Sequence, residues 1–405
     1  MLKCRSCNSE NISSIIPLGN LPLANALVTV SKKDESKQTY NLEVMLCKDC
    51  GLAQLKDLVD PKELFSEYIY FSSNSETMLT SVAELVNRVI PTLQKDAFVI
   101  EIASNDGYLL KNYVNKGIKV LGIDPAENIA KIANVNSVPT RCAFFCEQLA
   151  EKLAMSNQKA DIIHANNVMA HVPDINGFVK GLKVLLKESG SAIIEVPHFL
   201  ELVNKLEFDT IYHEHIYYFL VMALRPLFKR HGLEIYNIEK IPLHGGSLRL
   251  FISHNRNKNI DPVVEAIVKE EISQGLKNQE IYNKFMKKLE QLKNGLKSKL
   301  HNLKSDNAVI AAYGASAKGT TLLNYFGIGK ELIDFVVDRS QVKQGLYTPG
   351  TQLEILCPLQ LIERNISHAL LLTWNFAEEI FKQQKDFIAR GGKFVLPLPE
   401  VKVMP

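Results

Sequence analysis

The amino-acid sequence predicts an α/β protein with a doubly wound parallel sheet, flanked by a small N-terminal zinc-binding module and a C-terminal Rossmann-like domain. Two observations predict this class. Short apolar runs alternate with helical patterns from about residue 97 and again from about residue 308, and two C-x2-C pairs stand near the N-terminus. We therefore expect four parts, with boundaries at 1–66 (zinc-binding module), 67–258 (central α/β domain), 259–306 (bridging helices) and 307–405 (Rossmann-like domain).

Length and composition are those of a globular protein with two or three domains. The chain has 405 residues, of which 46% are hydrophobic and 22% charged, and its formal net charge is +3. So small a net charge does not predict a nucleic-acid partner. The apolar runs are too short to span a membrane, and the N-terminus lacks the apolar segment of a signal peptide. We expect a cytoplasmic protein with no nucleic-acid or membrane partner, while the oligomeric state is not predicted.

The two cysteine pairs are predicted to bind one structural zinc ion. "CRSC" contributes Cys4 and Cys7, and "CKDC" contributes Cys47 and Cys50. Each tight turn can present two thiolates to a tetrahedral ion, and four sulfur ligands leave no open position for catalysis. The long gap between the pairs requires an inserted hairpin or loop that returns the chain. The other cysteines lie in apolar contexts and are expected in the core: Cys142, Cys146 and Cys357.

The central domain alternates predicted strands with predicted helices. "AFVIEIA" (97–103) is a buried strand, followed by a turn and helix in "SNDGYLLKNYVNKG". "IKVLGID" (118–124), "ADIIHAN" (160–166) and "GSAIIEV" (190–196) continue the series. A ligand of such a sheet lies beyond the carboxyl ends of its strands.

Acidic residues at two strand ends indicate a nucleoside ligand. Glu101 stands near the end of the first strand, and Asp124 ends the second, where an acid can hold both ribose hydroxyls. The connecting turn lacks G-x-G-x-x-G, so a dinucleotide pyrophosphate is disfavoured and S-adenosylmethionine is favoured over NAD. A nucleotide-free α/β core is the alternative. The predicted cofactor contacts are Glu101, Ala103, Ser104, Asn105, Gly107, Asp124, Pro125, Asn166 and Asn167.

Five motifs in register resemble one family, the S-adenosylmethionine-dependent C-methyltransferases of nucleotide-activated deoxysugars. They are the four-cysteine module, "SNDG", "YHEH", "HGGSLR" and "YGASAKG", in order along nearly the whole chain. Ala103 and Asn105 depart from the glycines common in Class I methyltransferases but match this narrower group. The resemblance implies a Class I methyltransferase domain at 67–258. It also implies a nucleotide-diphosphate sugar substrate that is methylated at carbon, usually C3 of a 4-keto-deoxyhexose, through an enolate.

The stretch "FDTIYHEHIYYF" (208–219) gathers the acid–base groups that a carbon methylation needs. His215 is the candidate base because the pKa of an imidazole is already near neutral. Tyr212 lies three residues earlier, so a helical turn would place both side chains on one face. It is an alternative base or a donor to the enolate oxygen, and the choice between them stays open. Glu214 can orient an imidazole or hold a sugar hydroxyl, whereas His213 is expected to be structural or outward-facing.

The resemblance implies active-site roles for Tyr212, Glu214 and His215, and for two residues outside that stretch. His171, in "NNVMAHVPD", matches a family histidine at the sheet edge where a ligand is expected. An active-site tyrosine is expected in "EYIYFSSNSETM" (67–78), where Tyr70 is the closer match and Tyr68 the fallback.

The second half of the chain offers substrate contacts. "IPLHGGSLRLFISH" (241–254) pairs a double-glycine turn with a strand, and residues 262–305 read as two helices interrupted near Gly275. "AVIAAYG" (308–314) then begins the second α/β unit, whose turn resembles a phosphate-binding loop with Lys318 as a point charge. The predicted substrate contacts are Ser73, His244, Gly245, Ser247, Arg249, Tyr313, Lys318, Asn324 and Asp338.

Two other functions are kept as alternatives. An NAD-dependent oxidoreductase or epimerase would use the C-terminal Rossmann-like unit, although "YGASAKG" is a poor glycine fingerprint. A zinc-ribbon binding protein with an inactive methyltransferase core is the other, against which stand the pair Glu101 and Asp124 and the "YHEH" motif.

Overall fold

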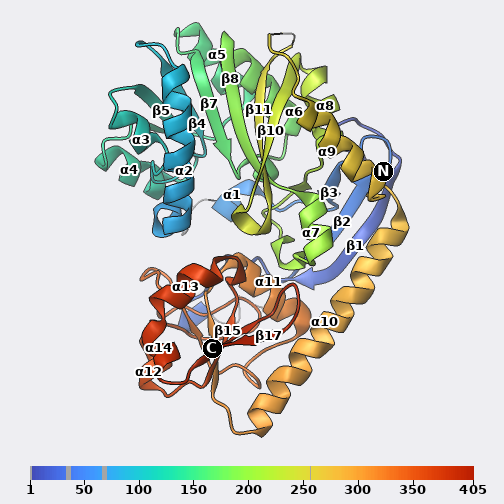
Figure 1. The fold of residues 1–405 in the computed structure, drawn as a ribbon, viewed down its shortest axis with the longest axis vertical. Helices are drawn as coiled ribbons and strands as arrows, with labels where there is room; N and C mark the ends of the chain where they lie inside the picture. Colours follow the sequence, from blue (N-terminus) through green and yellow to red (C-terminus); the bar gives the residue numbers. More distant parts are fainter. Residues whose placement is uncertain (1, 33–37, 66–70, 256) are drawn as a thin grey trace.

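The structure is a computed structural model that describes residues 2–32, 38–65, 71–255 and 257–405. Within these residues the strands form three sheets, which follow one another from the blue N-terminal end to the red C-terminal end of Figure 1. In this described part of the chain, no helix has both the length and the apolar character that crossing a membrane requires.

The N-terminal sheet is antiparallel, and its strand order is β1-β2-β3-β9. The strands are β1 (Ile12–Leu21), β2 (Tyr40–Cys47), β3 (Ala53–Leu55) and β9 (Tyr217–Tyr218), and the short helix α1 (Pro61–Phe65) follows β3. The β1–β2 hairpin returns the chain between the two cysteine pairs, which confirms that expectation. Because β9 belongs to "YHEHIYY", the candidate catalytic stretch completes the sheet of the zinc-binding module.

The central sheet has seven strands in the order β10-β11-β8-β7-β4-β5-β6, and its strands β4 to β8 are parallel while β11 is antiparallel to β8. The strands are β4 (Phe98–Ile102), β5 (Lys119–Asp124), β6 (Thr140–Cys142), β7 (Ala160–Asn166), β8 (Leu186–Pro197), β10 (Leu233–Ile241) and β11 (Ser247–His254). This sheet is the doubly wound parallel sheet that the sequence predicts, with an antiparallel edge.

Helices cover both faces of the central sheet because successive residues of its strands point to opposite sides. Val99 and Ile162 pack in the apolar cluster of helix α2, whereas Ile100 and Ile163 pack with helices α5 and α6. The helices are α2 (Glu76–Val89), α3 (Leu110–Val114), α4 (Glu127–Val135), α5 (Glu147–Met155), α6 (Ile175–Leu185), α7 (Phe199–Lys205) and α8 (Val221–Arg230).

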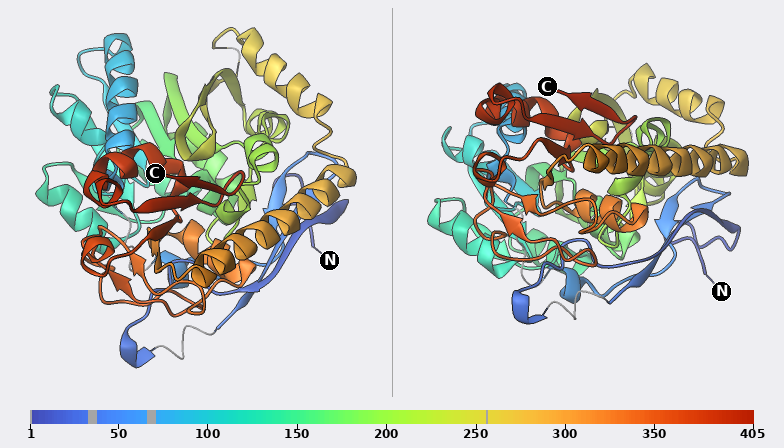
Figure 2. Two further views of the ribbon diagram at one scale, coloured as in Figure 1. Left: turned by 60° about the horizontal axis from the view of Figure 1, so that its bottom comes forward. Right: turned by 90° about the horizontal axis from the view of Figure 1, so that it is seen from below.

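Two helices, α9 (Pro262–Ser273) and α10 (Gln279–Ser305), follow the central sheet and precede the C-terminal sheet. They are interrupted around Gly275, which confirms the two predicted helices. Along α10 the buried residues recur every three or four positions: Tyr282, Phe285, Leu289, Leu292, Leu296 and Leu300. This stripe packs in one apolar cluster with β1 and the C-terminal sheet. Figure 2 shows α10 in orange, running from the blue N-terminal strands to the C-terminal domain. The N-terminal module, α10 and the C-terminal domain therefore share a core.

The C-terminal sheet is Rossmann-like, with the strand order β14-β13-β12-β15-β16-β17 and only β17 antiparallel. Its strands are β12 (Ile310–Tyr313), β13 (Val336–Val337), β14 (Ile355–Leu356), β15 (His368–Leu371), β16 (Lys393–Leu396) and β17 (Lys402–Met404). Its helices are α11 (Ala317–Phe326), α12 (Gln360–Glu363), α13 (Ala377–Gln383) and α14 (Lys385–Ala389).

One expectation about the core is wrong. Cys142 and Cys146 are exposed, and Cys357 is only half-buried. Cys142 ends the edge strand β6, and Cys146 immediately precedes α5, so their apolar sequence neighbours do not bring them into a core.

Candidate active site

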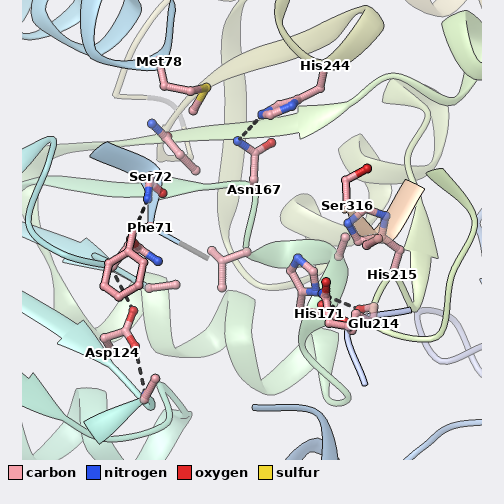
Figure 3. Close-up of a pocket in the computed structure, with 18 of the residues that line it drawn as sticks. Phe71, Ser72, Met78, Asp124, Asn167, His171, Glu214, His215, His244 and Ser316 are labelled. Atoms are coloured by element: carbon pink, nitrogen blue, oxygen red, sulfur yellow. Dashed lines mark hydrogen bonds between the residues drawn. The ribbon is translucent and has the colours of Figure 1, made fainter. Parts of the chain in front are cut away.

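A cavity of about 1360 Å³ lies at the carboxyl ends of the central strands, and the C-terminal domain faces it from the other side (Figure 3). The N-terminal module, the central domain and the C-terminal domain all contribute lining residues. Asn25 comes from the N-terminal module, Asp124 and His215 come from the central domain, and Ser316 and Lys318 come from the C-terminal domain. A ligand in this cavity would therefore contact all three parts.

The turn after β4 forms one end of the cavity. Ala103 and Asn105 have φ angles of 55° and 49°, a region that glycine adopts most readily. The turn thus has a left-handed backbone at two positions that are not glycine. Asp124 fixes it, because the backbone N–H of Asn105 donates to Oδ2 (2.9 Å) and that of Ala126 donates to Oδ1 (2.9 Å). Burial raises the pKa of Asp124, and these two N–H donors oppose the rise.

Two asparagines at the end of β7, Asn166 as its last residue and Asn167 directly after it, leave buried polar atoms for a ligand. Both side-chain atoms of Asn166, and Oδ1 of Asn167, are buried and have no hydrogen-bond partner among the described residues. Leaving such atoms unpaired costs free energy unless a ligand satisfies them. Because both residues line the cavity beside Asp124, this end fits a nucleoside with an amino-acid tail, such as S-adenosylmethionine.

Six of the nine predicted cofactor residues line the cavity: Ala103, Asn105, Asp124, Pro125, Asn166 and Asn167. Glu101, Ser104 and Gly107 do not, and their cofactor roles stay predictions. Glu101 is 1% exposed, and burial raises its pKa well above the ordinary value. Gly107 has a φ of 83°, and a Cβ there would lie 2.9 Å from Val138.

Tyr212 and His215 form a hydrogen-bonded pair in the cavity. His215 Nδ1 lies 2.7 Å from the carbonyl oxygen of Thr210, and a carbonyl only accepts, so Nδ1 carries the proton. In the neutral ring Nε2 then accepts from the Tyr212 hydroxyl at 2.9 Å. Burial holds the pKa of His215 well below its ordinary value, so the neutral form prevails. A turn, closed by the His215 N–H on the Tyr212 carbonyl, brings the two side chains together as the spacing predicts.

His171 and Glu214 complete this end of the cavity, and Figure 3 shows them beside His215. The Nδ1–H of His171 donates to the Glu214 carbonyl (2.8 Å), and the rings of His171 and His215 are 4.9 Å apart. Burial lowers the pKa of His171 to about 4 and raises that of Glu214 to about 7. The site thus holds two neutral imidazoles and a carboxyl poised near neutrality. Tyr70 and Tyr68 lie outside the described residues.

The sequence reasoning missed Asn25, whose Nδ2 donates to Glu214 Oε1 at 2.7 Å. Asn25 lies in "LPLANALV", an apolar stretch between the cysteine pairs that carries no local signal for a site. His213, by contrast, is structural as expected, since it is 3% exposed and its Nε2 contacts the Tyr40 carbonyl at 3.2 Å.

The turn after β12 forms the opposite wall. Ser316 Oγ accepts from the Gly319 N–H (3.1 Å) and so caps α11. Asp338 Oδ2 accepts from the Ala315 N–H (2.8 Å). Lys318 Nζ is buried without a hydrogen-bond partner among the described residues, 4.8 Å from the centre of the Trp374 ring. A helix N-terminus beside a cation suits an anionic group.

Five of the nine predicted substrate residues line the cavity: Ser73, His244, Tyr313, Lys318 and Asp338. The structure places the other four elsewhere. Arg249 is 4% exposed and pairs with Glu195 (2.7 Å) and Glu239 (3.0 Å). The remaining three contact other residues. Gly245 lies against the Glu207 side chain, Ser247 Oγ donates to the Leu243 carbonyl, and Asn324 Nδ2 donates to the carbonyls of Thr320 and Pro349. Their contact with substrate stays a prediction.

The four cysteine sulfurs of the N-terminal module lie within 4.8 Å of one another. Cys4 Sγ is 3.5 Å from Cys50 Sγ, and Cys7 Sγ is 3.6 Å from Cys47 Sγ. A tetrahedral zinc ion with Zn–S bonds of about 2.3 Å holds its sulfurs about 3.8 Å apart. The donor set and its spacing therefore fit zinc, and four protein ligands make the site structural.

The strand order, the turn after β4 and the acid that ends β5 define a Class I S-adenosylmethionine-dependent methyltransferase. Family models match the chain as a zinc binding domain (4–65), a methyltransferase domain (75–238) and a C-methyltransferase C-terminal domain (242–399). The C-methyltransferase NovU of Streptomyces niveus is 32% identical over 99% of this chain and 96% of its own. The chain therefore belongs to the C-methyltransferase family and is an S-adenosylmethionine-dependent enzyme with a zinc-binding module. This membership favours the methyltransferase prediction over the oxidoreductase and the non-catalytic alternatives.

More distant likenesses cover only part of the chain. A ubiquinone biosynthesis O-methyltransferase of Bartonella bacilliformis is 26% identical over 28% of this chain and 50% of its own. Among solved structures, the PH0226 protein of Pyrococcus horikoshii covers 49% of this chain and 100% of its own, at 16% identity and a TM-score of 0.38. Magnesium protoporphyrin IX methyltransferase of Synechocystis, solved with bound S-adenosylmethionine, covers 43% and 77% at 14% identity and a TM-score of 0.33.

Proposed function

We propose that this C-methyltransferase methylates C3 of a 4-keto-deoxyhexose that is linked to a nucleotide diphosphate. The observation that carries the proposal is the position of the Tyr212–His215 pair, which lines the same cavity as Asp124 on one side and Lys318 on the other. This order of groups suits a cofactor, a reacting sugar and a diphosphate along one cavity.

Methylation at carbon requires removal of a proton next to the ketone. S-adenosylmethionine, when bound, supplies an electrophilic methyl group at that carbon. In our proposal the Tyr212 hydroxyl takes the C–H proton while it gives its own proton to His215 Nε2, and the electron pair moves to the ketone oxygen. The Thr210 carbonyl, which accepts from Nδ1 at 2.7 Å, stabilises the resulting imidazolium. Direct transfer from carbon to His215 is the other route that this geometry supports.

The remaining groups position the sugar and its diphosphate. Glu214, with a pKa raised to about 7 by burial, can hold a sugar hydroxyl. The N-terminus of α11, which follows the Ser316 cap, and the Lys318 ammonium offer a site for the phosphates. The apolar part of the cavity wall, which includes Phe376, keeps water from the enolate.

The test follows the proton and the methyl group separately. In D2O without cofactor, we expect the wild-type enzyme to exchange the C3 proton of a nucleotide-linked 4-keto-6-deoxyhexose, seen by NMR. With cofactor, the product should gain one CH2 unit in mass. His215→Asn should lower both rates by about 1000-fold while calorimetry shows retained S-adenosylhomocysteine binding. Near-normal turnover in that variant would exclude His215 as the proton acceptor.

Tyr212→Phe decides between the two proton routes. Under the relay, this variant loses exchange about as fully as His215→Asn does. Under direct transfer to His215, it keeps a rate within about tenfold of the wild type, because only a hydrogen bond to Nε2 is lost.

A further inference from the structure

One turn of the zinc-binding module contacts both the central domain and the C-terminal domain. This turn, residues 22–28, lies between β1 and β2 and is called here the Asn25 turn. Its backbone is fixed at both ends, since Leu23 is buried and Val28 exchanges two backbone hydrogen bonds (3.1 and 2.8 Å) with Tyr347 of the C-terminal domain. Within it, the Leu27 N–H donates to the Asn25 carbonyl at 2.8 Å. The Asn25 side chain is therefore presented from a rigid support.

That side chain meets the candidate catalytic stretch. Asn25 Nδ2 donates to Glu214 Oε1 at 2.7 Å, and both residues line the cavity. Glu214 is 3% exposed, and its Oε2 accepts no hydrogen bond from the residues that the structure describes. With Oε1 held by the amide, Oε2 is the carboxylate oxygen that remains for a ligand. A carboxylate fixed in this way needs no reorganisation when the ligand arrives.

We propose that Asn25 is a positioning residue of the methyltransferase reaction: its amide holds Oε1 of Glu214 so that Oε2 accepts a hydroxyl of the sugar. The zinc-binding module thereby supplies part of the active site and does more than support the fold. The inference rests on the proposed function, because it takes the sugar as the ligand of Glu214.

If Asn25 positions Glu214, replacing Asn25 should change the pKa of Glu214. Burial raises the pKa of Glu214, and the Asn25 amide opposes the rise because it stabilises the ionised carboxylate. Removing the amide should raise that pKa further, so that the ionised form requires a higher pH. His171 and His215 face Glu214 but titrate at lower pH, and the phenol of Tyr212 pairs with His215.

Two further acids in the same region, Glu207 and Asp209, have pKa values raised by burial to about 7 and about 6. They titrate in the window of Glu214. Because Asn25 donates to Glu214, replacing Asn25 should move the Glu214 titration and leave theirs in place.

The experiment uses the full chain loaded with zinc and compares Asn25→Ala with the wild type. We expect kcat with the nucleotide-linked keto sugar to fall about tenfold at pH 7, and the acidic limb of the kcat–pH profile to move up by about one unit. Affinity for S-adenosylhomocysteine should not change. Asn41→Ala is the matched control, since Asn41 Nδ2 donates to Asp57 at the same distance, 2.7 Å, on the surface of the same module. This control should behave as the wild type.

A second readout does not depend on the substrate. In protein labelled with carbon-13 at the glutamate carboxyls, the Glu214 resonance, assigned by its loss in Glu214→Gln, should titrate at a higher pH in Asn25→Ala than in the wild type. If the wild type methylates no nucleotide-linked keto sugar, the proposed function fails while this titration still decides whether Asn25 controls Glu214. An unshifted titration, or a wild-type kcat–pH profile in a variant that keeps zinc and cofactor binding, overturns the inference. Should Asn25→Ala not fold, the isosteric Asn25→Asp variant is used, with the same upward shift expected because two carboxyls then face each other.

Discussion

Two turns of this protein share one construction and differ in charge. Each follows a parallel strand, and in each an acid at the end of the next strand accepts a backbone N–H of the turn: Asp124 from Asn105 (2.9 Å), and Asp338 from Ala315 (2.8 Å). Around the first turn, Asn166 and Asn167 supply neutral polar atoms. Around the second, Lys318 and Lys343 supply cations. The fold thus supplies two similarly built turns, and the proposed function assigns the cofactor to the first and the phosphates of the substrate to the second.

The largest effects on ligand binding are expected from replacing the acids of the two turns, Asp124 and Asp338. Asp124→Ala should weaken S-adenosylhomocysteine binding by about 100-fold, because charged hydrogen bonds to a ribose are lost, and should leave binding of a nucleotide-diphosphate sugar nearly unchanged. Asp338→Ala, its counterpart and control, should show the reverse preference. Isothermal titration of both ligands to both variants gives the answer. If Asp338→Ala weakened cofactor binding as much as Asp124→Ala does, the two turns would not be separate sites.

A smaller change should follow from removing the cation of the second turn. Lys318→Gln should weaken the binding of a nucleotide-diphosphate sugar by about tenfold, since one point charge near two phosphates is lost. The loss should shrink at high salt, where the wild-type interaction is screened. Cofactor affinity, measured on the same sample, serves as the internal control. A variant that loses affinity for the cofactor and the sugar nucleotide alike would show a general structural defect and no phosphate contact.

The sequence predicts what depends on neighbouring residues and misses what depends on register and long-range contact. Each C-x2-C turn and the Tyr212–His215 pairing are local, and the structure contains them. The two cysteine pairs meet across 40 and 46 positions of the chain, and this was predictable because two such pairs are a known pattern of zinc ligands. The position of Arg249 follows instead from two antiparallel registers, which set it directly opposite Glu239 and Glu195, so that it forms ion pairs away from the cavity.

Asn25 is a clearer example of a site residue that the sequence does not reveal, because its contact is long-range. Its contact with Glu214 spans 189 positions of the chain, and nothing in the apolar segment around it indicates a site. The prediction for Cys142 and Cys146 is wrong in the opposite direction. Their apolar sequence neighbours predict core positions, but Cys142 lies at a sheet edge and Cys146 at a helix start, and both are exposed. Patterns within one segment therefore predict its secondary structure better than they predict which of its residues reach a shared cavity.

The smallest expected effect concerns how the cation of the second turn is balanced. Burial raises the pKa of Glu207 to about 7, and the charge of Lys318 opposes the rise, so the two groups interact electrostatically. Below that pKa Glu207 is neutral and the Lys318 charge is left for phosphates. Above it the carboxylate offsets that charge. Affinity for a nucleotide-diphosphate sugar should therefore fall about threefold between pH 6 and pH 8. The diphosphate diester of this ligand keeps its charge across that range, so the change belongs to the protein.

Glu207→Gln removes the effect of Glu207 ionisation on affinity, because the amide keeps the volume of the carboxyl and does not ionise. At pH 8 its affinity should be about threefold higher than that of the wild type, and the pH dependence that remains should come from the other acids near the site, including Glu214, whose pKa burial also raises to about 7. Asp209, whose Oδ2 accepts from Trp374 Nε1 at 2.7 Å and whose pKa is raised by burial to about 6, still ionises in this variant and accounts for any remaining slope near that pH. An undiminished slope centred near pH 7 would place the controlling group elsewhere. In that case the difference between the two turns would rest on the cations alone and not on the buried acid beside them.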